Sequence, residues 1–227
     1  MPDDSPLATP APHAAPIRCV ENLRVDEELL RAGRPIARVA VLADRALSIG
    51  VGVPESAEYL TRARDRGWPI VRRGSGGEAV LHGGGDLAWS LVLPRSDPRV
   101  GHDYSRAYAR LGRAVVRFLA EAGIRSRWAP APHLSESYCL LGPRGSALYV
   151  DDRVLGGAAQ HATARALLHH GILPRTLDVR ALEEIFGLSR EGGLERLTSL
   201  QELGLTDSPR RLGARLAEQL TNEVSTG

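Results

Sequence analysis

The stretch IVRRGSGGEAVLHGGGDLAWS, residues 70–90, decides the fold, because short apolar runs alternate in it with clusters of glycine. We predict strands at 69–73, 78–82 and 86–94, the last ended by Pro94. The intervening glycines allow positive φ and leave bare N–H groups able to bind an anion or a carbonyl. The stretch lacks Gly-Lys-Ser/Thr and is followed by a strand, so it is neither a P-loop nor a dinucleotide fingerprint. Two tight hairpins that bind no ligand are the alternative.

Outside this stretch, strands are expected mostly before helices. Residues 37–52 are predicted to form two short strands, and residues 147–160 a hairpin. Apolar side chains spaced by three and four predict one helix over 104–123, and the chain from residue 176 onward is predicted to be helical. This order favours an α+β architecture, in which helices pack on one side of a sheet, over a βαβ winding.

The composition is that of a globular chain with a balanced charge. The 227 residues are 43% hydrophobic, enough for a core, and the formal net charge is +2. All 29 basic residues are arginine, and 27 acidic residues are interspersed among them, so we expect no nucleic-acid partner. No apolar run reaches the ~18 residues of a membrane span, so no membrane association is expected.

The N-terminus and the cysteines indicate the domain organisation and the compartment. Residues 1–16 are rich in Pro and Ala and lack the basic and apolar regions of a signal peptide, so we predict a disordered tail. Cys19 and Cys139 fit neither a zinc pattern nor a disulfide scaffold, which predicts a reduced, cytoplasmic chain without a metal site. Residues 17–227 are expected to form a single domain.

The residue order in the glycine-rich stretch resembles the lipoate–protein ligase and octanoyltransferase family. The pattern is Arg-Arg-x-Ser-Gly-Gly-x-Ala-Val-x-His, followed by Gly-x-Leu-x-x-Ser. The resemblance implies a mixed, largely antiparallel sheet flanked by helices, as in biotin and lipoate ligases, and one acyltransferase-like catalytic domain. In this family the stretch lines the channel for the acyl group. The substrate-binding residues implied are Arg72, Arg73, Ser75, Gly76, Gly77, Ala79, Gly156, Gly157 and Ala158.

The sequence SESYC, residues 135–139, resembles the context of the catalytic cysteine in one subgroup of octanoyltransferases. That subgroup takes octanoate from acyl carrier protein through an acyl-cysteine thioester and needs no ATP. The resemblance therefore implies that Cys139 is the nucleophile, that an octanoyl or lipoyl group is the substrate, and that no cofactor is required. A buried, small apolar side chain is the structural alternative for Cys139.

The resemblance places Arg153 where the family carries a lysine that contacts the acyl carbonyl. An arginine can stabilise a thiolate and donate to a carbonyl, but its pKa above ~12 prevents it from shuttling a proton. We therefore expect Cys139, Arg153 and His82 to be the catalytic residues, with His82 as the proton acceptor. His169 and His170 are the next candidates for that role.

The function implied is transfer of an octanoyl or lipoyl group, through a cysteine thioester, to the lysine of a lipoyl domain. The partners expected are acyl carrier protein and a lipoyl carrier, either the H protein or a 2-oxoacid dehydrogenase subunit. The first alternative is an ATP-dependent lipoate–protein ligase. The second is a non-catalytic protein that binds lipoyl domains or acyl groups and has lost catalysis with the family lysine.

Overall fold

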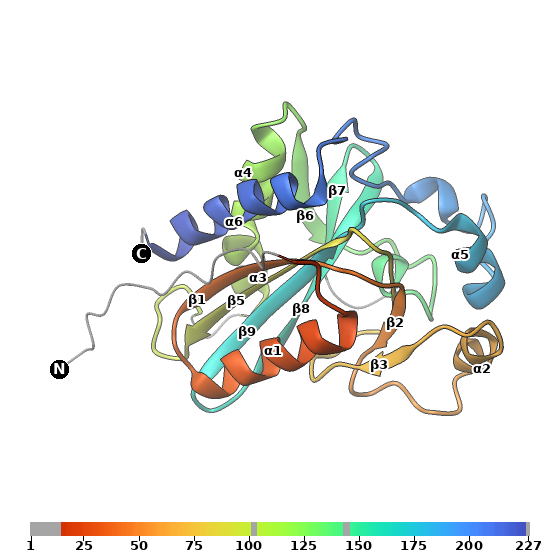
Figure 1. The fold of residues 1–227 in the computed structure, drawn as a ribbon, viewed down its shortest axis with the longest axis horizontal. Helices are drawn as coiled ribbons and strands as arrows, with labels where there is room; N and C mark the ends of the chain where they lie inside the picture. Colours follow the sequence, from red (N-terminus) through yellow and green to blue (C-terminus); the bar gives the residue numbers. More distant parts are fainter. Residues whose placement is uncertain (1–14, 101–103, 143–145, 226–227) are drawn as a thin grey trace.

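The computed structural model describes residues 15–100, 104–142 and 146–225. The predicted tail, residues 1–16, lies outside the described residues except for Ala15 and Pro16. Two sheets organise the fold (Figure 1), and the larger has the strand order β1-β5-β9-β8-β7-β6 with every neighbouring pair antiparallel. Its strands are β1 (Ile36–Val41), β5 (Leu87–Pro94), β9 (Ala166–Leu173), β8 (Arg153–Ala162), β7 (Ser146–Val150) and β6 (Ser126–Pro130).

The smaller sheet is built around β2. Strand β2 (Ala46–Ile49) lies between β3 (Ile70–Arg72), to which it is parallel, and β4 (Val80–His82), to which it is antiparallel. The mixed, largely antiparallel sheet implied by the resemblance is therefore confirmed. Two tight hairpins along 70–90 are not formed, because β3 and β4 are separated by β2 instead of pairing with each other.

Helices cover both faces of the larger sheet, so the expectation of helices on one side is wrong. Along β5, Leu91 packs with Phe118 and Leu216 in the cluster beneath the later helices, whereas Val92 packs with Leu30 on the opposite face. Because neighbouring strand residues point to opposite faces, a strand such as β5, which is apolar at all positions but Ser90, needs cover on both faces. Figure 1 shows α1 and α6 on opposite sides of the sheet. The helices are α1 (Cys19–Ala32), α2 (Glu58–Asp65), α3 (Tyr104–Leu111), α4 (Arg113–Ala120), α5 (Val179–Phe186) and α6 (Pro209–Ser225), with short 3-10 turns η1 (Cys139–Leu141) and η2 (Leu194–Arg196).

Two helix predictions needed correction. The helix expected over 104–123 is divided at Gly112, whose carbonyl accepts a hydrogen bond from Trp128 Nε1 at 2.9 Å. A Cβ at Gly112 would overlap the same indole, so the close approach of β6 decides the break. Within 193–204 only η2 is helical. There the backbone N–H of Thr198 donates to a carbonyl of β8, at 2.9 Å, in place of a helical partner.

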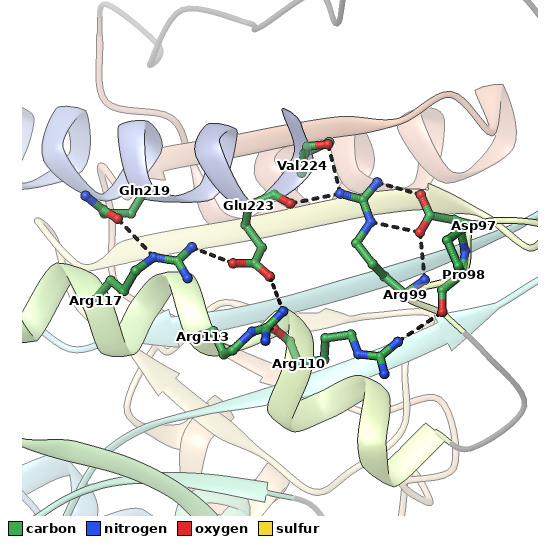
Figure 2. Close-up of polar contacts among 9 residues, drawn as sticks. All are labelled: Asp97, Pro98, Arg99, Arg110, Arg113, Arg117, Gln219, Glu223 and Val224. Carbon is green, nitrogen blue, oxygen red and sulfur yellow. Dashed lines mark hydrogen bonds and ion pairs between the residues drawn. The ribbon is translucent and has the colours of Figure 1, made fainter. Parts of the chain in front are cut away.

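Arginine side chains bind the end of the C-terminal helix, α6, to the rest of the fold (Figure 2). Arg99 donates to the carbonyl oxygens of Glu223 and the next residue, both at 2.8 Å, where the last turn of a helix lacks intrahelical partners. Asp97 holds the Arg99 guanidinium through two oxygens, at 2.8 and 2.6 Å. The buried Glu223 carboxylate lies between Arg113 and Arg117 of α4. Every helix in the described part of the chain is too short or too polar to cross a bilayer.

Candidate active site

A cavity lies where α1, the small sheet, η1 and strands β8 and β9 meet. Most of its wall is aliphatic, and a few polar side chains converge on it. Such a mixture is typical of a site that buries an apolar ligand and orients one reactive group. The aliphatic wall includes Leu23, Leu42, Val80, Leu140, Ala158 and Ile172; the polar side chains include Asp26, Ser48, Arg73, His82, Cys139 and His170.

Small residues of β8 keep this cavity open. Gly157 and Ala158 line it, as the resemblance implied. A Cβ at Gly157 would stand 2.7 Å from Leu140 Cδ2, so a larger residue would push η1. Gly156 lies outside the lining. Its Cβ would overlap the carbonyl oxygen of Ile172, so this glycine serves the close pairing of β8 with β9.

Cys139 is held against the glycine-rich loop by backbone hydrogen bonds. Its N–H donates to the Ala79 carbonyl at 2.8 Å, and the Ala79 N–H donates to the Ser137 carbonyl at 3.1 Å. Ala79 itself is buried outside the cavity lining, so its contribution is to join the two loops. Gly77 has φ +90°, and a Cβ there would lie 2.9 Å from Cys139 Sγ and 3.0 Å from Arg73 Nη2. The thiol and the guanidinium therefore both face the same point above Gly77.

Arg73 supplies a positive charge near Cys139, of the kind that a nucleophilic thiol requires. Its guanidinium is buried and donates to the carbonyls of Ser48, Gly76 and Glu78, at 3.0, 2.9 and 2.7 Å. Burial lowers the pKa of Arg73, and the charge of Cys139 is the first of the influences that raise it. A fixed positive charge beside a thiol favours its thiolate. The resemblance implied substrate binding for Arg73; its electrostatic interaction with Cys139 was not foreseen.

Arg153 does not stand beside Cys139, which corrects the sequence-based expectation. It begins β8, its side chain is 42% exposed, and its Nη1 lies 3.2 Å from Glu202 Oε2. The part of β8 that lines the cavity begins at Gly157, about 13 Å farther along the strand at ~3.3 Å per residue. Arg153 therefore lies at the hairpin end of β8, whereas the cavity is lined by the middle of the strand.

Two other residues of the glycine-rich stretch, Arg72 and Gly76, also lie outside the cavity lining. Arg72 donates to the carbonyls of Gly50 and Val53, at 3.0 and 2.8 Å, and pairs with Glu55. Neighbouring residues of a strand point to opposite faces, so only one of the two arginines can reach the cysteine. Gly76 is exposed, and a Cβ there would have no neighbour within 4 Å.

His82 lines the cavity as a buried, neutral imidazole. Its Nε2 lies 2.7 Å from Ser48 Oγ, and its Nδ1 has no hydrogen-bond partner among the described residues. Burial, followed by the charges of Arg73 and His170, lowers the pKa of His82 to about 3. A group with such a pKa holds almost no proton at neutral pH, so it can orient a ligand better than it can accept a proton.

Sequence reasoning missed a hydrogen-bonded series that runs beside the cavity. Ser75 Oγ lies 2.8 Å from His170 Nε2, and His170 Nδ1 lies 3.3 Å from Asp26 Oδ2. Ser75, predicted to bind substrate, is 1% exposed and turns its hydroxyl to this histidine. The three residues come from the glycine-rich loop, β9 and α1. The sequence offered each residue separately, but no spacing indicated that they meet. Within the described residues, no group of three or more His, Cys, Asp and Glu side chains could hold a metal ion.

Several known proteins resemble this chain in sequence. Residues 18–220 match the family model described as the lipoyl protein ligase A/B catalytic domain. Similar curated proteins include Octanoyltransferase LipM of Macrococcus caseolyticus, 27% identical over 191 residues, which are 78% of this chain and 69% of the relative. The same enzyme of an Exiguobacterium species is 27% identical over 213 residues, which are 84% of this chain and 75% of the relative.

Solved structures of the same fold include lipoate-protein ligase A bound with ATP, at a TM-score of 0.75 and 23% identity, covering 93% of this chain and 83% of that one. A putative lipoate protein ligase from T. acidophilum gives a TM-score of 0.73 at 22% identity, covering 93% and 82%. At these identities the likeness shows the fold alone, and it confirms the lipoate-ligase-like fold implied by the resemblance.

Proposed function

Because the chain belongs to the lipoyl protein ligase A/B catalytic-domain family, we propose that it transfers an octanoyl or lipoyl group to a lysine of a lipoyl domain through a thioester on Cys139. The observation that carries the proposal is that Cys139 Sγ and the Arg73 guanidinium both face Gly77 in the wall of an apolar cavity. The cavity would take the acyl chain, and the buried charge would favour the thiolate.

The reaction then has two halves. In the first, the Cys139 thiolate attacks the carbonyl carbon of an acyl thioester, and the thiol of the donor leaves. In the second, a lysine amine of the acceptor attacks the acyl-enzyme, and Cys139 is released. Relatives named octanoyltransferase support an octanoyl donor, for which acyl carrier protein is proposed. A structural neighbour from Thermoplasma acidophilum was solved as a bipartite ligase and its E2 lipoyl domain, which supports a lipoyl domain as acceptor.

The test is intact mass spectrometry of the protein after incubation with octanoyl-acyl carrier protein. We expect one octanoyl group that hydroxylamine removes, and we expect Cys139→Ala to abolish it. Cys19→Ala is the matched control. Cys19 lines the same cavity but is 2% exposed, and burial, followed by the charge of Asp44, raises its pKa to about 12.

Two results would contradict the proposal. Labelling that persists in Cys139→Ala would show that another residue carries the acyl group. Lipoate-dependent exchange between ATP and pyrophosphate, without a cysteine adduct, would establish the ATP-dependent ligase instead. A folded protein that shows neither activity but binds a lipoyl domain would be the non-catalytic binder.

A further inference from the structure

The series Ser75–His170–Asp26 has a definite polarity. Asp26 Oδ1 accepts hydrogen bonds from Arg38 Nη1, at 2.9 Å, and from Ser90 Oγ, at 2.8 Å. The Asp26 and Arg38 side chains are each 3% exposed, so the carboxylate and the guanidinium form a buried ion pair. An ionised carboxylate only accepts hydrogen bonds, which assigns the proton of the neutral His170 ring to Nδ1.

This assignment leaves His170 Nε2 as an acceptor, to which the Ser75 hydroxyl donates across 2.8 Å. A histidine held in this tautomer by a carboxylate can accept a proton at Nε2, because the carboxylate stabilises the imidazolium that results. The arrangement therefore has the polarity of a proton relay that runs from the serine hydroxyl toward the aspartate.

The other basic groups at the cavity are poorly suited to carry a proton. The chain contains no lysine, and an arginine such as Arg73 remains protonated at any physiological pH. His82 in the cavity wall and His169, which lies outside the lining, are both buried, and burial is the main cause that lowers the pKa of each to about 3. His169 is further committed to ring contacts with Trp89 and Tyr108, at centroid distances of 5.1 Å. His170 is the remaining histidine of the cavity wall, which it shares with Cys139.

We propose that His170 is the proton-transfer residue of the second half-reaction, with the Ser75 hydroxyl as its relay and Asp26 as its positioning residue. This inference rests on the proposed function. As the acceptor amine forms its C–N bond with the acyl carbon, it gives up one proton, which passes through Ser75 to His170 Nε2. As the C–S bond breaks, the sulfur of Cys139 takes the electron pair, and the proton returns to it. One proton thus leaves nitrogen and one reaches sulfur.

The surroundings of His170 define what its pH dependence reports. The Asp26–Arg38 pair faces Nδ1 from α1 and β1, and the ion pair Glu27–His161 lies close to Gly74, beside the same loop. A pH profile measured for the transfer step reports on His170 together with the charged and titratable groups around it. The charged and titratable groups around it are Asp26, Glu27, Arg38, Arg73, His82, His161 and His169.

The experiment separates the two half-reactions. The full chain is first acylated with octanoyl-acyl carrier protein, and the acyl-enzyme is then mixed with a lipoyl domain while the remaining adduct is followed by rapid-quench mass spectrometry across pH. For His170→Gln we expect acylation to persist and transfer to slow by ~10²–10⁴-fold. The rise of the transfer rate with pH that a proton-accepting group produces should disappear. Ser75→Ala should slow transfer but retain that rise, because His170 remains.

His161→Gln is the matched control, since this histidine pairs with Glu27 outside the cavity lining, and its rate and profile should equal the parent's. A parent-like pH profile in His170→Gln, or an equal loss of both half-reactions, would overturn the inference. If that variant does not fold, an unchanged transfer rate in Ser75→Ala overturns it. If the parent forms no acyl-enzyme, the proposed function fails at the first step and this inference fails with it.

Discussion

Replacing Gly77 by alanine should damage the active site, whereas the same change at the neighbouring Gly76 should not. At Gly77 the backbone has φ +90°, and the new Cβ would lie 2.9 Å from Cys139 Sγ and 3.0 Å from Arg73 Nη2. At Gly76 the Cβ would meet nothing within 4 Å, and the backbone does not have a positive φ. The two variants therefore add the same methyl group to the same loop in opposite environments.

The structure gives the size of the effect. A non-glycine residue in the left-handed region costs ~1–2 kcal/mol, so Gly77→Ala should lower the free energy of unfolding by about that much. The Cβ must also displace the thiol, the guanidinium or both. Each ~1.4 kcal/mol by which this displacement weakens the effect of the charge on the thiol corresponds to about one decade in the rate of Cys139 acylation. Gly76→Ala should leave the free energy of unfolding unchanged or slightly higher, because alanine restricts the unfolded chain.

Urea denaturation measures the first quantity, and the pH dependence of Cys139 alkylation by iodoacetamide measures the second. In Gly77→Ala the Cys139 thiol should be alkylated more slowly than in the parent at the same pH, because its cation has moved away. Equal unfolding free energies and equal alkylation profiles in the two variants would refute the reasoning. In that case Arg73 would not be the group that activates Cys139.

Two further predictions concern residues outside the cavity. Arg153→Ala should leave acylation and transfer unchanged and cost at most ~1 kcal/mol of stability, because its contact with Glu202 is an exposed ion pair; a large loss of activity with intact stability would restore it to the site. Arg99→Ala should lower the free energy of unfolding by ~1–3 kcal/mol in urea denaturation, since it removes the hydrogen bonds to the end of α6 and leaves Asp97 buried without its partner. Burial would raise the pKa of Asp97, but its hydrogen bonds with Arg99 outweigh burial and lower it. The stability that this pair adds to the parent is therefore present above the ordinary Asp pKa of ~3.9, and it is lost as pH falls through the lowered value. An Arg99→Ala protein with parent-like stability at every pH would contradict this.

Local pattern was enough for much of the fold. The apolar run 86–94 is β5, the residues on either side of Asp151 form the β7–β8 hairpin, and the last predicted helix is α6. In these segments local preference and tertiary packing agree. Where they compete, packing decides: the helix over 104–123 breaks where Trp128 packs against Gly112.

The order of residues in 70–90 determined the family and the type of fold. A strand, a glycine loop and a second strand, with two arginines and a serine, form a pattern that identifies the family from the sequence alone. Proximity across the fold could not be determined in that way. Arg153 is close to Cys139 in sequence but far along β8 from the cavity, whereas Arg73 is distant in sequence and faces Gly77 together with the thiol. A hairpin turns the nearer arginine toward solvent, while backbone hydrogen bonds between Ala79 and the cysteine loop bring the farther one in.

The histidines also differ in what the sequence alone determined and what only the tertiary structure decided. Sequence alone supplied His82 and the pair His169–His170 as candidates, and chemistry makes any of them a possible base. Only the tertiary structure distinguishes them, because burial without a carboxylate disfavours the proton on His82 and His169. Helix α1 delivers Asp26 to His170 alone. The protonation of a side chain depends on the charge and solvent around it, and these are set by residues that the chain brings together only when it folds.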